Sequence, residues 1–182
     1  MAASRVPSRP AAAAAGYQAG RPRRTRVLVA ATVVVSGLLA GGTGDRALVA
    51  TPAWRHLGPT AWAAYSRHAD LGAGLVVYPL AGISAAVLAV AAAISYRFDR
   101  PRPRAVAVPI YLAAMCQLGV MATTIKAAPI MLGVADPEDP SALAQAFDQF
   151  TLWGLTVRGT LAVLGFLAAT WALLALSRGQ HS

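Results

Sequence analysis

The chain contains four long apolar stretches, at residues 27–50, 71–96, 105–134 and 151–177. Each has the roughly 20 residues that a helix needs to cross the ~30 Å hydrocarbon core of a bilayer. A soluble protein with buried helices is the alternative, but with 57% hydrophobic residues little surface would remain to dissolve it. The sequence therefore predicts an all-α, integral membrane four-helix bundle over residues 27–178.

Residues 1–26 are rich in Arg, Ala and Pro and hold almost nothing that a folded core could bury. This composition predicts a disordered tail. An export signal is the alternative, because Arg23 and Arg24 precede an apolar run. A retained first helix is favoured, since apolar residues resume after Arg46 and no small-residue cleavage site follows the run closely.

The basic residues between the stretches alternate from one side to the other. Six lie in residues 1–26, two before the second stretch, four between the second and third, none between the third and fourth, and one at Arg178. The positive-inside rule then places both termini and the turn at residues 97–104 in the cytoplasm. Four aromatic residues are expected near the outer membrane interface: Trp54, Trp62, Tyr65 and Trp153.

The two outer connections are predicted to be helical rather than irregular. Residues 60–70 follow Gly58 and Pro59 and can run into the second stretch, while Asp139 is a candidate N-cap with Pro140 at the first helical position. Small residues Gly37 and Gly41 favour close helix packing within the bundle over a dimer face. Kinks are expected at the prolines within the stretches, Pro79, Pro109 and Pro129.

Four charged residues lie inside the apolar stretches, Asp45, Arg46, Lys126 and Arg158, and His68 falls at a similar depth. Such charges are costly in a membrane, so they usually pair or line a cavity. One hypothesis is an outward-facing polar pocket in which Asp45 balances part of the positive charge and an anion, phenolate or lipid headgroup binds. The alternative is that Arg46 and Lys126 extend to the interface while Asp45 and Arg158 form a structural ion pair.

Several chemistries lack their motifs. Cys116 is the single cysteine, and the histidines show no metal-ligand spacing, so we expect neither a metal nor a cofactor. No P-loop, dinucleotide fingerprint or nucleophile elbow is present. The basic residues flank apolar stretches, where they meet lipid headgroups, and we therefore expect a lipid bilayer and not nucleic acid as the partner.

Short motifs resemble those of the anthrone-oxygenase-like family of small four-helix membrane proteins. They are residues 37–41 (GLLAG), 51–54 (TPAW), 78–79 (YP) and 126–129 (KAAP), with Trp153 and Arg158. The resemblance covers residues 27–177 and implies a four-helix bundle. Some members are associated with cofactor-independent oxidation of anthrones by molecular oxygen, and most bacterial members have no assigned activity. The chain departs from the family at residues 130–131 and 155–157, where the family tends to carry Asn or His.

The residues and the resemblance together predict a multi-pass protein of the inner (plasma) membrane that binds a small anionic or phenolic molecule or a lipid. If it is such an oxygenase, Arg158 and Lys126 would stabilise an enolate or phenolate, and Asp45 or His68 would take the proton. The alternative is a non-catalytic structural or accessory subunit. No pattern indicates an oligomeric state.

Overall fold

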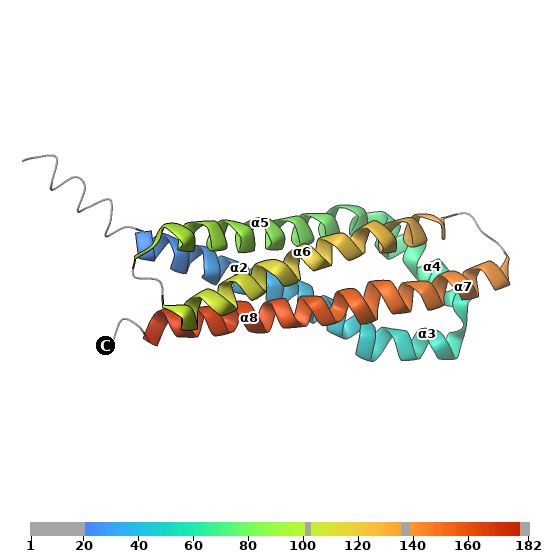
Figure 1. The fold of residues 1–182 in the computed structure, drawn as a ribbon. Coiled ribbons are helices and arrows are strands. Elements are labelled where there is room, and N and C mark those ends of the chain that lie inside the picture. Colours follow the sequence, from blue (N-terminus) through green and yellow to red (C-terminus); the bar gives the residue numbers. More distant parts are fainter. Residues whose placement is uncertain (1–20, 101–102, 136–138, 179–182) are drawn as a thin grey trace, which may run out of the picture.

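The computed structural model of the protein describes residues 21–100, 103–135 and 139–178, and four long helices account for nearly all of them (Figure 1). Three are interrupted by a π-helical segment, labelled η. Helix one comprises α2 (Arg21–Asp45), η1 (Arg46–Ala50) and α3 (Thr51–Leu57), and helix two comprises α4 (Pro59–His68), η2 (Ala69–Ala73) and α5 (Gly74–Phe98). Helix three is α6 (Arg104–Leu132), and helix four comprises α7 (Pro140–Phe150), η3 (Thr151–Val157) and α8 (Arg158–Arg178).

The four helices are long and apolar enough to cross a membrane, and the described residues contain no strand. The predicted all-α class is therefore confirmed, and so is the number of helices that are long and apolar enough to span a membrane. The predicted bounds of helix one are too short, because it begins at Arg21 and ends at Leu57. Residues 21–26 of the predicted tail are thus helical, and residues 1–20 lie outside the described residues.

A buried polar contact explains why helix one starts early. Thr25 is fully buried; its Oγ1 lies 2.8 Å from Ser95 Oγ and donates a 2.7 Å hydrogen bond to Asp99 Oδ2. Both partners lie at the end of helix two, where Tyr96 Oη also donates to the carbonyl of Pro103 at 2.8 Å. The contact fixes the first turns of α2 against α5. We call this end of the bundle, where α2 begins and α8 ends, the terminal end.

The bundle is antiparallel, and each helix packs on two neighbours. Helices α2 and α6 each contact both α5 and α8 (Figure 1). Alanines line much of the interface, including Ala89 and Ala92 of α5 and Ala172 of α8. Larger Leu, Val and Ile side chains point outward instead. Small residues inside and large apolar residues outside are typical of helices that pack in lipid, where the hydrophobic effect does little to join them.

The predicted glycine pair in helix one divides between two environments. A Cβ on Gly37 would lie 3.1 Å from the Phe166 ring of α8, so this glycine serves packing within the bundle. Gly41 is exposed and has no atom within 4 Å of the same position. Of the two glycines, only Gly37 therefore contributes to helix packing within the chain.

At the opposite end, which we call the cap end, α3, α4 and α7 pack together over the bundle (Figure 1). Their core is aromatic: the Trp62 ring centroid lies 5.2 Å from that of Phe147 and 5.6 Å from that of Phe150. Trp54 and Trp62 are buried in this core. They pack within the cap, and their predicted level near the outer membrane interface stays a prediction.

Helical connections were predicted, and both are present. Asp139 caps α7 as expected, with its side chain accepting a hydrogen bond from Ser141 N at 3.0 Å. Helices α5 and α6 are not broken at Pro79, Pro109 and Pro129, and the kinks expected there stay a prediction. The non-helical backbone inside helix two lies at Gly72 instead, within η2.

Candidate functional site

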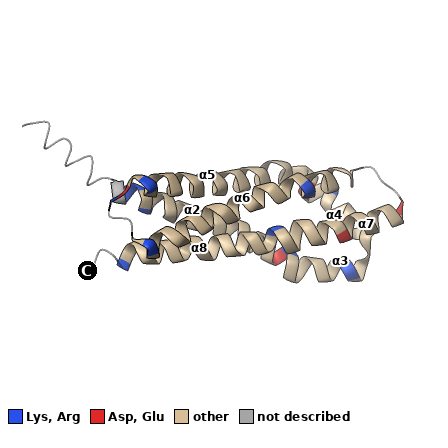
Figure 2. Cartoon of the chain, in the orientation of Figure 1, with Lys and Arg blue, Asp and Glu red and all other residues tan. Residues whose placement is uncertain are grey.

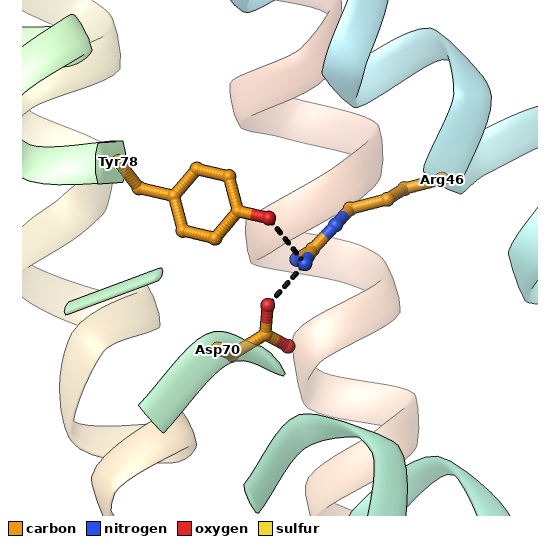
Figure 3. Close-up of polar contacts among 3 residues, drawn as sticks. All are labelled: Arg46, Asp70 and Tyr78. Carbon is orange, nitrogen blue, oxygen red and sulfur yellow. Dashed lines mark hydrogen bonds and ion pairs between the residues drawn. The ribbon is translucent and has the colours of Figure 1, made fainter. Parts of the chain in front are cut away.

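A buried ion pair joins helix one to helix two below the cap. Arg46 is the first residue of η1, and its Nη2 contacts Oδ1 of Asp70, which lies in η2 (Figure 3). The side chains of Arg46 and Asp70 are only 14% and 5% exposed. In Figure 2 the Lys and Arg residues are densest at the terminal end, and the other charges are scattered between the middle of the bundle and the cap end. Charges within apolar spans are costly. A buried pair is therefore an exception that needs a reason.

Tyr78 of α5 completes the surroundings of Arg46. Arg46 Nη2 donates a 2.7 Å hydrogen bond to Tyr78 Oη, and the guanidinium carbon lies 4.7 Å from the ring centroid (Figure 3). The ring position depends on Gly74, where a Cβ would come within 2.7 Å of both the Tyr78 ring and the carbonyl oxygen of Ala69. The phenol and the carboxylate thus hold the guanidinium from two sides.

A second guanidinium lies in the same region. Arg158, the first residue of α8, is half-buried and interacts electrostatically with Arg46 and Tyr78. Its Nη2 reaches α5, where it lies 4.0 Å from the position of a Cβ on Gly82. Among the described residues, Arg158 has neither an ion pair nor a hydrogen-bond partner. Of the two guanidinium groups, only that of Arg46 is paired with a carboxylate. We call Arg46, Asp70, Tyr78 and Arg158 the arginine cluster.

The three charged members of the cluster occur at irregular points of their helices. Arg46 begins η1, Asp70 lies within η2, and Arg158 directly follows η3. π-Helical segments are rare in proteins and often mark functional positions, because the extra residue in the turn redirects side chains. Here each of these segments lies toward the cap end and bears on the same polar site.

The structure brings together only part of the predicted site. Arg46 and Arg158 interact, but Asp45 is exposed on α2, Lys126 is exposed on α6, and His68 is exposed on α4. The proposed counter-ion Asp45 makes no ion pair in the described chain, and the alternative Asp45–Arg158 pair does not form. His68 Nδ1 lies 2.9 Å from the carbonyl oxygen of Ala64, so it serves its own helix.

Asp70 and Tyr78 are the members of the cluster that the sequence analysis did not select. The sequence places Asp70 at the top of helix two, at a level similar to that of the other charges, but Asp45 was proposed as the counter-ion. In the structure helix two begins at Pro59, and Asp70 is buried within it, two residues before the non-helical backbone at Gly72. Tyr78 carried a signal in the YP pair of the family motifs, but a tyrosine in an apolar stretch is ordinarily a packing residue.

Other polar groups lie apart from the cluster. Gln117 of α6 is fully buried, and neither of its amide atoms has a hydrogen-bond partner. Its Nε2 would lie 2.8 Å from a Cβ placed on Gly165 of α8, so the amide rests against a glycine backbone. Cys116 is buried. Among the residues that the structure describes, no group of three His, Cys, Asp or Glu side chains could hold a metal ion.

A groove of about 320 Å³ lies between helices one and four at the cap end. It runs between η1 with α3 on one side and η3 on the other, and its lining comprises Ala47, Thr51, Pro52, Arg55, Thr151, Leu155 and Thr156. Neither arginine of the cluster lines it, although Ala47 follows Arg46 directly in sequence.

Comparison of the chain with protein-family models, with curated proteins and with solved structures finds no match in any of the three. The resemblance to anthrone-oxygenase-like proteins thus stays a prediction from the short motifs, and the function must be argued from the site itself.

Proposed function

We propose that the protein is a multi-pass protein of the plasma membrane whose arginine cluster binds the anionic group of a small acid or phenol. The observation that carries this proposal is Arg158, a half-buried guanidinium beside Arg46 with no carboxylate of its own. Removing a cation from water is expensive unless a partner repays the cost. Asp70 neutralises one of the two guanidinium groups, which leaves one positive charge for a ligand.

The polar surroundings of the cluster fit an aromatic acid or a phenolate. Guanidinium groups bind carboxylates and other planar anions through paired N–H donors, and such charge-assisted bonds are stronger than neutral ones. The Tyr78 ring lies against Arg46, and Asp70 Oδ2 is buried without a hydrogen-bond partner. A ligand that carries both an anion and a hydroxyl group would satisfy Arg158 and Asp70 together.

Binding can be measured with salicylate, which has a carboxylate and a phenol. We expect purified protein in lipid nanodiscs to bind it, and Arg158→Gln to weaken binding about tenfold to a hundredfold, the loss of one charge-assisted hydrogen bond. Lys126→Gln is the matched control, because it removes an exposed cation of α6. Equal affinity of the Arg158 variant and the unmodified protein would overturn the assignment.

The proposed orientation places both termini in the cytoplasm and the cap outside. The positive-inside rule supports it, because basic residues concentrate at the terminal end: Arg23, Arg24, Arg26, Arg97, Arg100, Arg104 and Arg178. The arginine cluster would then lie toward the outer face. The test is a fusion, after Arg178, of a reporter enzyme that works only outside the cytoplasm. Activity of this fusion would contradict the proposed orientation.

Turnover is a proposal on the same residues, following the family resemblance. An anthrone and one O2 would give an anthraquinone and water, with the arginines stabilising the enolate formed when a base removes a proton. Asp45 and His68 do not contact the cluster, so the carboxylate within it is Asp70. Membranes containing the protein should convert an anthrone under air, and those with Asp70→Ala should not. Conversion no faster than in empty membranes would exclude this reaction.

An accessory subunit is the second candidate, favoured by the outward face of α2. Gly41, Gly42 and Asp45 are exposed there, and nothing lies within 4 Å of a Cβ on either glycine. This face could receive the helix of another protein. Gly41→Leu should then abolish co-purification of a stoichiometric partner in mild detergent, whereas a monodisperse monomer from native membranes would count against the subunit role.

A further inference from the structure

We propose that the groove between helices one and four holds one anionic phospholipid from the leaflet on the cap side, with its phosphate on Arg55. The site is separate from the arginine cluster, because neither Arg46 nor Arg158 lines the groove. It rests on the proposed membrane insertion but not on the proposed small-molecule ligand. At about 320 Å³, its volume lies at the lower end of the range for ligand sites.

The walls of the groove are mostly apolar, although three threonines line it. Thr51 Oγ1 donates a 2.7 Å hydrogen bond to the carbonyl of Arg46. Thr156 Oγ1 donates likewise to the carbonyl of Thr151 at 3.0 Å. These two hydroxyl groups therefore donate to backbone carbonyls of their own helices. With Ala47, Pro52 and Leu155, they leave a surface that suits hydrocarbon.

Arg55 is the one charged residue of the lining. It is exposed, and it forms no ion pair within the described residues. An apolar slot with a single cation complements an amphiphile with a negatively charged head, and an arginine binds phosphate oxygens through two parallel N–H donors. The charge of the groove thus selects an anionic lipid over a zwitterionic one.

The depth of the groove matches the position of a lipid. Counting about 20 residues of hydrocarbon core from Val27 places Ala47 near the core's boundary. Arg55 lies eight residues further along helix one, about 12 Å at 1.5 Å per residue, toward the headgroup region. The acyl chains would therefore lie beside Ala47 and Leu155, and the phosphate would reach Arg55. The π-helical segments η1 and η3 both contribute lining residues and contact each other at this level.

The test is native mass spectrometry of the full chain in mild detergent, titrated with phosphatidylglycerol or phosphatidylcholine. We expect one retained lipid and a preference for phosphatidylglycerol. Arg55→Gln should reduce that preference about fivefold, the effect of one basic residue near an anionic lipid. Lys126→Gln is the control, since it removes an exposed cation on a helix that does not line the groove, and it should keep the preference.

A second pair of variants tests the slot. Ala47→Trp should fill the groove and abolish retention of either lipid, while Leu48→Trp, at a neighbouring exposed residue outside the lining, should not. Unchanged retention in the Ala47 variant, or an unchanged preference in the Arg55 variant, would overturn the proposal. Equal binding of inorganic phosphate at Arg55 without a lipid tail would overturn it as well. Loss of salicylate binding through Arg158→Gln is a separate result and leaves this site unaffected.

Discussion

The substitution Asp70→Asn tests whether the arginine cluster is held by one carboxylate. It keeps the shape of the side chain but removes its charge, so that Arg46 and Arg158 face each other without a counter-ion. Breaking a buried ion pair from one side costs about 3–5 kcal/mol. We expect about 3 kcal/mol, the lower end, because Arg46 keeps its hydrogen bond and ring contact with Tyr78.

The opposite substitution, Arg46→Met, should cost less. It leaves Asp70 in the same cluster as Arg158, whose guanidinium interacts electrostatically with Arg46 and Tyr78, so one positive and one negative charge remain in the cluster. The loss in free energy of unfolding should therefore be about 1 to 2 kcal/mol smaller than for Asp70→Asn, a fraction of the cost of an unpaired buried charge. Arg46→Met should lose less free energy of unfolding than Asp70→Asn only if Arg158 belongs to the cluster.

The measurement is the free energy of unfolding in mixed detergent micelles, with both single variants and the Arg46→Met/Asp70→Asn double variant. Residues in contact should depart from additivity, and the double variant should lose less than the sum of the single variants. Asp148→Asn on the exposed face of α7 is the control and should stay within about 0.5 kcal/mol of the unmodified protein. Additive losses, or a larger loss for Arg46→Met than for Asp70→Asn, would refute the reasoning.

Substitutions at the glycines of the bundle and at the cap of α7 test the fold. Gly165→Ala places a Cβ 2.8 Å from Gln117 Nε2 and should destabilise the bundle by about 1–3 kcal/mol, and adding Gln117→Ala should restore part of this loss. In the control Gly41→Ala the new Cβ meets no atom, so this variant should be neutral or stabilising. Equal unfolding temperatures for the two glycine variants would contradict this. Hydrogen bonds from Ser141 lower the pKa of Asp139. The cap therefore stabilises the fold above the unfolded pKa of about 4, and this stabilisation is lost as pH falls through the folded pKa. The unfolding temperatures of the unmodified protein and of Asp139→Ala should therefore converge in acid. A difference that stays constant with pH would argue against the cap.

The number and class of the helices could be predicted from the sequence because the membrane imposes a simple requirement. A span must be long, apolar and internally hydrogen-bonded, and four stretches satisfy this. Helix ends were harder to predict, since they depend on contacts between distant residues. The first turns of helix one, for example, are held by a hydrogen bond from Thr25 to Asp99, 74 residues away.

The candidate site could be predicted in part because the membrane requires its spans to be apolar. Buried arginines stand out in apolar sequence, and Arg46 and Arg158 were identified in this way. Their counter-ion could not be chosen between Asp45 and Asp70, because η1 and η2 change the direction in which side chains point at that level. Adjacent residues on a helix face about 100° apart, so Asp45 points outward while its neighbour enters the cluster.

The three π-helical segments also determine how this chain must be aligned with any relative. A π turn contains one residue more than an α turn, so a relative with regular helices would be one letter shorter at residues 46–50, 69–73 or 151–157. Gaps would then belong inside helices, where alignment methods usually penalise them most. An alignment that moves such a gap into the neighbouring connection shifts the arginines and the aspartate out of register with their true counterparts, and a shared site would go unnoticed.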